Sequence, residues 1–137
     1  FGFGLNTSLP TGNYSKTALI GKGANLQLAY RFVKSAEAVL QVNVDVFNPK
    51  SIWDESSLTA LGLVGARFYA TRHILVGMNA GHGTFVYGDY PAKSGLAISP
   101  EIGYTSENFQ ALFNYSSINT DYYGKISFVG FRISYIL

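Results

Sequence analysis

The chain of 137 residues contains no cysteine, which excludes a disulfide scaffold and any thiolate metal site. It also lacks a run of the roughly 18 to 20 apolar residues that a membrane-spanning helix requires, so a membrane protein with this sequence must cross with strands. Charge is scarce as well. Charged residues make up 13% of the chain, against about a quarter in ordinary soluble domains. A net charge of +2, with no basic run, argues against nucleic-acid binding.

Apolar and aromatic residues are abundant, at 47% and 15% of the chain. The length predicts a single domain over residues 1–137. The sequence begins with a strand pattern at Phe1, without a basic stretch and apolar core of the signal-peptide kind, so we expect a mature or trimmed chain.

The last segment, 125–137, carries the clearest organising pattern. Every second residue from Val129 to Leu137 is apolar or aromatic, whereas Gly130, Arg132 and Ser134 alternate with them. A terminal strand of this kind would be an exposed edge in an open sheet. We therefore expect it to pair with the alternating segment that begins at Phe1, which would close a barrel.

Similar alternation predicts eight strands and connections that are long and short in turn. The Pro100 position predicts a bulge or a broken ladder bond in the sixth strand. The predicted long connections are 10–23, 48–56, 85–94 and 116–123, and the short ones are 34–37, 71–73 and 105–108. The predicted strands are 1–9, 24–33, 38–47, 57–70, 74–84, 95–104, 109–115 and 125–137.

Two eight-stranded barrels fit this pattern, and they differ in the face that meets water. A soluble lipocalin-like carrier would turn its apolar faces inward and need many charges on its outer wall. Only five charged residues fall in predicted strand bodies, and the other 13 fall in or beside turns and loops. The pattern therefore favours a transmembrane barrel with apolar faces toward lipid and polar faces inside.

Aromatic residues near the strand ends are typical of membrane-interface belts. The sequence predicts one belt at each end of the barrel. At the short-turn end these residues are Phe32, Phe68, Tyr104, Phe109 and Tyr135; at the loop end they are Phe47, Trp53, Phe85, Tyr87, Tyr115 and Tyr123.

Over its whole length the chain resembles the small eight-stranded outer-membrane barrels of Gram-negative bacteria, such as the OmpA membrane domain and OmpX-like, porin-like proteins. Such barrels commonly end in an aromatic residue, whereas this chain ends in Leu137 after Tyr135. The resemblance implies an all-β, up-and-down antiparallel transmembrane barrel in the outer membrane. It also implies that the partners are the lipid bilayer and other outer-membrane proteins in a larger complex, without a cofactor or nucleic acid.

The charges of the predicted strand bodies form the candidate interior site. Because an isolated buried charge is costly, we expect these side chains to pair across the lumen. The favoured interpretation is a plug that fills a narrow barrel, and the alternative is a gated, anion-preferring constriction. The residues are Arg31, Asp45, Arg67, Glu101 and Arg132.

His82 and Thr84 share one face of a predicted strand, as the His and Ser of outer-membrane lipid hydrolases and acyltransferases would. The nucleophile would be a Thr, however, and no acid lies on the neighbouring strand at that height. His73 is predicted to be a solvated turn residue, and two distant histidines do not make a metal site. We therefore expect no enzymatic activity.

We expect a non-enzymatic structural or interaction subunit whose longer loops face outside. The alternatives are a narrow small-solute porin, a lipid-modifying enzyme and a soluble lipocalin-like carrier. Aromatic residues of the predicted loops are the expected partner contacts. They are Trp53, Phe85, Tyr87, Tyr90, Tyr122 and Tyr123.

Overall fold

The computed structural model describes residues 1–11, 18–49, 56–88, 92–120 and 124–137. In this part of the chain all regular structure is strand, and no helix is long and apolar enough to cross a membrane. The strands are β1 (Gly2–Thr11), β2 (Ala18–Val33), β3 (Ala36–Pro49), β4 (Ser57–Tyr69), β5 (Ile74–Tyr87), β6 (Lys93–Thr105), β7 (Phe109–Thr120) and β8 (Gly124–Ile136).

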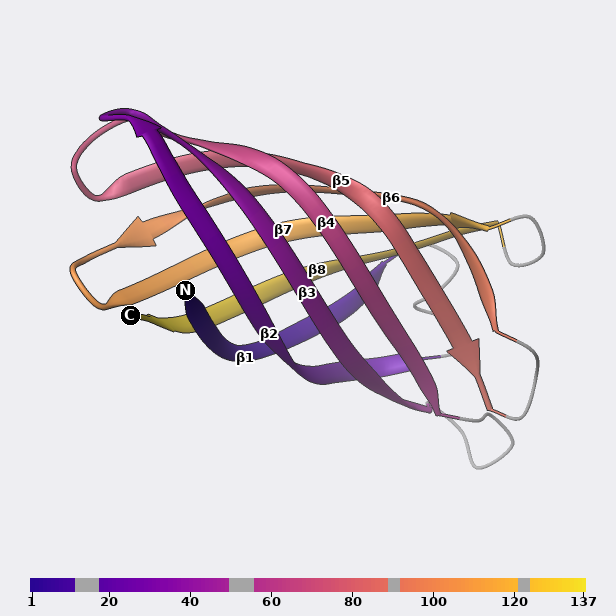
Figure 1. Ribbon diagram of the computed structural model, residues 1–137. Helices are drawn as coiled ribbons and strands as arrows, with labels where there is room; N and C mark the ends of the chain where they lie inside the picture. The colour runs from indigo at the N-terminus through magenta and orange to yellow at the C-terminus, as the bar shows by residue number, and fades with distance from the viewer. Residues whose placement is uncertain (12–17, 50–55, 89–91, 121–123) are drawn as a thin grey trace.

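The strands form a closed barrel in which each strand pairs with its sequence neighbours and β8 pairs with β1 (Figure 1). All pairings are antiparallel, and the two ends of the chain lie side by side, with Gly2 opposite Ile136 and Thr11 opposite Ser127. The predicted eight-stranded up-and-down barrel and its closure through the chain ends are therefore confirmed. Closure leaves no sheet edge unpaired.

The register sets the stagger of the barrel. A path through paired residues that leaves β8 at Ile136 passes around all eight strands and returns to β8 at Ile126, ten residues away. Eight strands with a stagger of ten residues tilt by about 40° and leave a lumen that side chains can fill.

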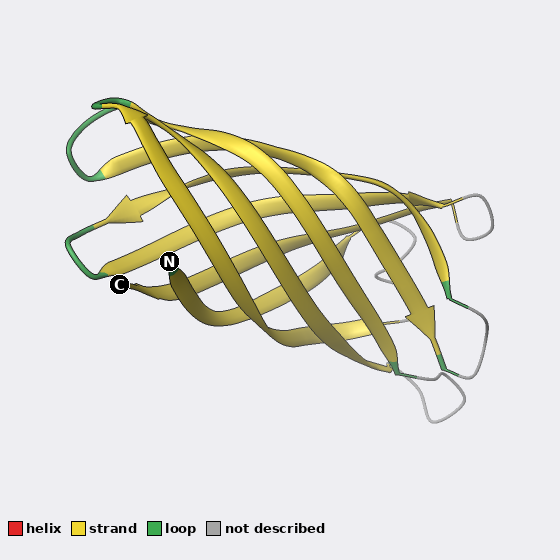
Figure 2. Ribbon diagram, in the orientation of Figure 1, coloured by secondary structure: helices red, strands yellow, loops and turns green. Residues whose placement is uncertain are grey.

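The two ends of the barrel differ in their connections (Figure 2). At the end called here the turn end, the connections span 34–35, 70–73 and 106–108, and both termini lie there. At the opposite end, called the loop end, the strands reach further than the sequence predicted. β2 begins at Ala18, β5 continues to Tyr87 and β7 continues to Thr120, so the predicted long loops 10–23, 85–94 and 116–123 are wrong in extent. Small and polar residues obscure the alternation in 18–23 and 116–120, and 85–87 is apolar at every position, but the backbones of all three segments pair with a neighbouring strand.

The position of Pro100 interrupts the ladder between β6 and β7. Residue pairs run to Ile98 opposite Ser117 and resume at Glu101 opposite Asn114 in the same register. Proline has no N–H to donate, so the ladder is broken there without a bulge, which was one of the two predicted outcomes.

Apolar side chains point outward and polar ones inward over most of the barrel. Asn25, Gln41 and Asn79 are buried, while Leu26, Val42 and Met78 beside them are about half exposed. This arrangement excludes the lipocalin-like alternative, whose apolar faces would point into the lumen. The outward aromatic residues at the turn end match the predicted belt: Phe32, Phe68, Tyr104, Phe109 and Tyr135.

Candidate functional site

Three charged side chains from different strands meet inside the barrel near the turn end, and they are called here the charge network. Arg67 on β4 donates from Nε to Glu101 Oε1 on β6 at 2.6 Å, and from Nη2 to Gln27 Oε1 at 2.8 Å. Arg132 on β8 places Nη1 3.6 Å from Glu101 Oε2. Arg67 is only 1% exposed, so its charge is compensated inside the protein rather than by water.

Glu37 joins this network, although the sequence suggested that it belonged to a turn. It is the second residue of β3 and is buried, with Oε1 3.6 Å from Arg67 Nη1 and 2.9 Å from the donating hydroxyl of Tyr69. Its position continues the inward alternation of Val39 and Gln41 toward the turn, and this signal could have identified it.

Arg31 and Asp45, the other two predicted residues, lie at the margins of the network. Arg31 is at the rim, 54% exposed, with Nη2 3.9 Å from Glu37 Oε2 and its guanidinium stacked 4.5 Å above the Tyr69 ring. Asp45 is buried nearer the loop end, and no ion pair of the described residues includes it. It lines a cavity of about 10 Å³ together with Arg132.

Neutral polar side chains fill the lumen around the charges. Gln27 donates to Gln110 at 3.0 Å, and Asn25 donates to Asn6 at 2.8 Å. The hydroxyls of Ser99 and Ser116 lie 2.9 Å apart. The Gln27–Gln110 bond crosses the lumen between β2 and β7, which are not neighbours in the sheet, whereas the other two bonds join adjacent strands.

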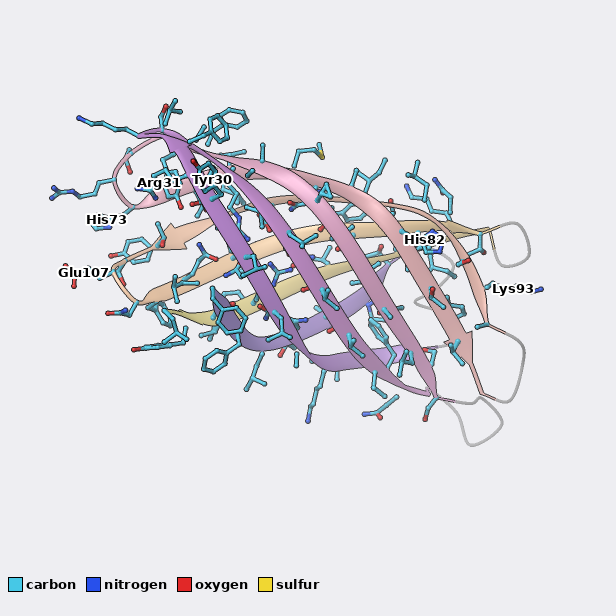
Figure 3. The ribbon with its side chains drawn as sticks, viewed as in Figure 1. Tyr30, Arg31, His73, His82, Lys93 and Glu107 are labelled. Carbon is cyan, nitrogen blue, oxygen red and sulfur yellow. The ribbon has the colours of Figure 1, made fainter. Side chains whose placement is uncertain are left out.

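The mouth at the turn end is a polar vestibule. It encloses about 150 Å³ and is lined in part by Arg31, Glu37, Tyr69, Glu107 and Gln110. Figure 3 shows Arg31 and Glu107 at this end of the barrel, with His82 and Lys93 toward the other. His73 lies in the exposed 70–73 turn, as predicted.

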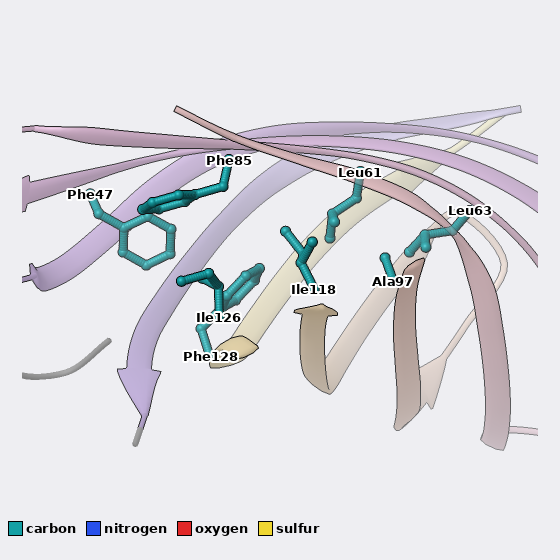
Figure 4. Close-up of a cluster of buried hydrophobic side chains, with 8 residues drawn as sticks. All are labelled: Phe47, Leu61, Leu63, Phe85, Ala97, Ile118, Ile126 and Phe128. Atoms are coloured by element: carbon teal, nitrogen blue, oxygen red, sulfur yellow. The ribbon is translucent and has the colours of Figure 1, made fainter. Parts of the chain in front are cut away.

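Toward the loop end the lumen holds a cluster of apolar side chains, called here the apolar plug (Figure 4). Phe47 on β3 and Phe128 on β8 meet edge to face, with ring centroids 5.4 Å apart. The sequence predicts a mainly polar interior, and a continuous apolar cluster in this half of the lumen differs from that prediction. The plug consists of Phe47, Leu61, Leu63, Phe85, Ala97, Ile118, Ile126 and Phe128.

The predicted interface role of Phe47 and the predicted loop position of Phe85 are both wrong. Phe47 is 0% exposed and Phe85 is 3% exposed, and both point into the plug. Each strand continues past its phenylalanine, so the alternation that turns Asp45 and Gly83 inward carries these rings inward as well.

Glycines on neighbouring strands make room for the plug. A Cβ atom at Gly21 would lie 2.6 Å from Phe47 Cε1, and one at Gly83 would lie 2.8 Å from side-chain atoms of Ile118 and Leu61. The absence of a side chain at these two positions is therefore a packing requirement of the aromatic and branched residues opposite.

The remaining predicted loop contacts are only partly placed. Tyr87 is the last residue of β5. Trp53, Tyr90, Tyr122 and Tyr123 lie outside the described residues, as does the predicted belt role of Trp53 and Tyr123.

His82 and Thr84 both point to the outside of β5. His82 is opposite Gly62 and Leu96, and Thr84 is opposite Ala60 and Ser94. None of these four partners carries a carboxylate or an amide that could orient the imidazole.

Taken together, an outward apolar wall, a sheet closed on itself and a side-chain-filled lumen define the class of small transmembrane-type β-barrels. Solved structures agree with this class. The chain is similar to Ail, the attachment invasion locus protein of Yersinia pestis, with a TM-score of 0.73 and 16% identity, covering 98% of this chain and 94% of Ail.

It is also similar to two barrels of Pseudomonas aeruginosa. The N-terminal barrel domain of OprF gives a TM-score of 0.61 at 12% identity, covering 98% of this chain and 96% of that one. The outer-membrane protein OprG gives 0.53 at 10% identity, covering 98% and 92%. No family model and no curated protein matches the sequence. The shared feature is therefore the fold, that of a small outer-membrane barrel.

Proposed function

We propose that this protein is an integral outer-membrane barrel, closed to solutes, that serves as a structural or interaction subunit and has no catalytic activity. The observation that carries the proposal is a lumen filled at two heights by side chains of different chemistry. The apolar outer wall and the fold shared with Ail, OprF and OprG support the outer membrane as its location.

Closure rests on two independent obstacles. Toward the turn end, Arg67 and Arg132 both form ion pairs with Glu101 inside the lumen. Toward the loop end, Phe47 and Phe128 pack against each other across it. A solute would have to break buried ion pairs and also displace a packed aromatic pair, so we expect no steady conductance.

A narrow ion porin is the second candidate, and the vestibule is the observation that favours it. The charged mouth encloses about 150 Å³, and Arg67 and Glu37 are among the residues that line it. Conduction would then require the charge network and the apolar plug to open together.

Catalysis at His82 is not proposed because the partners opposite His82 and Thr84 cannot complete a catalytic set. An acyl-transfer nucleophile needs a base and an orienting group within hydrogen-bond reach. Gly62, Leu96 and Ala60 offer neither, and Ser94 opposite Thr84 adds a second hydroxyl but no carboxylate or amide to orient His82.

Binding to partner proteins is proposed to occur at the loop end of the barrel. Trp53, Tyr90, Tyr122 and Tyr123 are proposed as contacts with other outer-membrane proteins, since tryptophan and tyrosine are enriched among the residues that anchor protein interfaces. Phe85 is not one of these contacts, because its side chain is buried in the apolar plug. Ail, which has the same fold, is by name a protein of attachment and invasion.

Conductance in planar bilayers tests the closed barrel. The wild type and the Glu101→Gln variant should both be silent, because the plug remains after the network is weakened. Steady single-channel currents from the wild type would overturn closure and establish the porin alternative. A heat-dependent shift on SDS gels confirms in each case that the inserted protein is folded.

Photo-crosslinking in outer membranes tests the interaction role. A photoreactive residue at Tyr90 or Tyr122 should give discrete protein adducts, whereas one at the lipid-facing Met78 should give none. Equal adducts from loop and lipid-facing positions, or none from either, would contradict a loop-mediated partner.

A further inference from the structure

A small cavity lies inside the barrel where the charge network meets the apolar plug. It encloses about 10 Å³, and its lining includes Arg132 of the network together with Leu61 and Phe128 of the plug. Figure 4 shows Leu61 and Phe128 among the plug residues. All other residues of the lining are polar, and they are Asn6, Ser8, Asn43, Asp45, Asn114 and Ser116.

The lining of this cavity is almost entirely removed from bulk water. Every lining residue except Asn114 is buried, and Asp45 and Arg132 are each only 2% exposed. The volume of the cavity is close to the ~10 to 15 Å³ that a single water molecule requires. The polar groups in this space must therefore be satisfied by one another or by one small occupant.

Four side-chain atoms of the lining make no hydrogen bond to any residue that the structure describes. Two are acceptors, Asp45 Oδ1 and Asn43 Oδ1, and two are donors, Arg132 Nε and Nη1. Arg132 Nη1 lies 3.6 Å from Glu101 Oε2, which makes an ion pair but is too long for a hydrogen bond. Buried polar atoms are nearly always paired with protein or with ordered water, so these four atoms indicate an occupant of the cavity.

The two opposite charges of the lining come from strands that are not neighbours. Asp45 is on β3 and Arg132 is on β8, and β1 and β2 separate these strands around the barrel. Among the described residues no direct ion pair joins the two side chains. Asn43 shares the inward face of β3 with Asp45, two residues away. A carboxylate and a guanidinium therefore line one small cavity without pairing directly.

The chemistry of the unpaired atoms decides which occupant fits. A cation would be attracted by the oxygens of Asp45 and Asn43 but repelled by the guanidinium of Arg132. An anion would be attracted by Arg132 but repelled by the carboxylate of Asp45. A water molecule can both donate and accept hydrogen bonds, so it satisfies both kinds of atom without adding a charge.

The other oxygen atoms around the cavity do not make a metal site. Asn6 Oδ1 already accepts from Asn25 Nδ2 at 2.8 Å, and Ser116 Oγ accepts from Asn114 Nδ2 at 2.8 Å. Asp45 is the only carboxylate among the described residues that line the cavity. The described part of the chain also holds no group of three or more histidine, cysteine or carboxylate side chains suited to a metal ion. A hard cation, which takes six or more oxygen ligands, would be poorly coordinated here.

We propose that one ordered water molecule occupies this cavity and bridges Asp45 to Arg132. The water donates to Asp45 Oδ1 and Asn43 Oδ1 and accepts from Arg132 Nε. Arg132 is then held between two carboxylates, that of Glu101 directly and that of Asp45 through the water. A water-mediated bond is nearly as favourable in enthalpy as a direct one, so Asp45 becomes part of the charge network. The site lies inside the lumen and does not depend on the proposed interaction role.

Crystals of the refolded barrel, grown from a buffer that contains rubidium bromide, test the occupant. At a resolution that shows ordered water, one density peak should lie about 2.7 to 3.2 Å from both Asp45 Oδ1 and Arg132 Nε. Data collected at the rubidium and bromine absorption edges should show no anomalous signal at this peak. The absence of a peak would overturn the proposal, and an anomalous signal would overturn it in favour of a bound ion.

Two variants at one position test the contact with Asp45. Asp45→Asn keeps the shape of the side chain and an oxygen that can accept from water, so the peak should remain. Asp45→Leu has a side chain of similar size without an acceptor, so the peak should be lost. Loss of the peak in Asp45→Asn, or its persistence in Asp45→Leu, would contradict the bridge. A heat-dependent gel shift shows that each variant is folded, and the wild type and Asp45→Asn still decide the outcome if Asp45→Leu does not fold.

Discussion

The two halves of the lumen are both filled by side chains, but the side chains are charged in one half and apolar in the other. The turn half is filled by Arg67, Glu101 and Arg132, whose partners are few and directional. The loop half is filled by side chains such as Phe47 and Phe128, which need only shape and volume. Polar filling therefore depends on every partner being present, whereas apolar filling depends on space.

The largest effect is expected from removing the shared carboxylate of the polar half. Glu101→Leu would leave Arg67 and Arg132 buried without their common partner, and we expect a loss of up to about 5 kcal/mol in the free energy of unfolding. Urea unfolding of the refolded barrel, followed by tryptophan fluorescence, measures it. The matched control is Glu107→Gln in the exposed 106–108 turn, which should change stability by less than about 0.5 kcal/mol. Equal effects from both variants would contradict the network.

A smaller but still large effect is expected in the apolar half. Phe128→Ala removes a ring that is 1% exposed and should cost about 3 to 4 kcal/mol through lost burial and a residual cavity. Phe113→Ala on the lipid-facing wall should cost less than half as much, because acyl chains can fill the space it leaves. The same unfolding measurement applies. A larger loss at Phe113 would show that the plug is not a packed core.

Two glycines distinguish space inside the plug from space outside the barrel. Gly21→Ala places a methyl group 2.6 Å from Phe47 Cε1 and should cost about 2 kcal/mol by overpacking. Gly62→Ala faces outward with no atom within 4 Å and should be close to neutral. Urea unfolding gives the change in the free energy of unfolding for both variants. No loss for Gly21→Ala would mean that the side chains of the plug can move to accommodate the added methyl group.

The smallest effect is expected at the rim of the polar half. Arg31 is 54% exposed and pairs with Glu37 at 3.9 Å, so Arg31→Gln should cost less than about 1 kcal/mol. A loss as large as that of Glu101→Leu would place the rim pair in the same cooperative unit as the buried network. Unfolding at low and high salt distinguishes an exposed rim pair from a part of the buried network, since only the exposed pair is strongly screened by salt.

The fold could largely be predicted from the sequence, because the alternation of apolar and polar residues depends only on neighbours within one strand. The faces of β3, β5, β6 and β8 follow directly from it, as does the inward position of Arg67 beside Leu61 and Leu63. Strand ends were read less well. Segments such as 18–23 and 116–120 are rich in small and polar residues, and only pairing with a neighbouring strand shows that they are extended.

The candidate site could be predicted in part, again from the alternation along each strand. Arg67, Glu101 and Arg132 could be placed inside by alternation alone, and Glu37 was missed only because the strand was begun two residues too late. The plug could not be anticipated, since a phenylalanine at a presumed strand end fits an interface belt equally well. Its inward direction depends on strands that continue past Phe47 and Phe85.

The sequence by itself determined that the chain forms strands, that these close a barrel, and which face of each strand is apolar. Those properties depend on a period of two and on the need to pair both terminal strands. Only the tertiary structure decided which residues meet. The stagger of ten residues sets which side chains from opposite walls share a height, and it brings Phe47 to Phe128 and Arg67 to Glu101. A stagger belongs to the closed sheet as a whole, so no single strand encodes it.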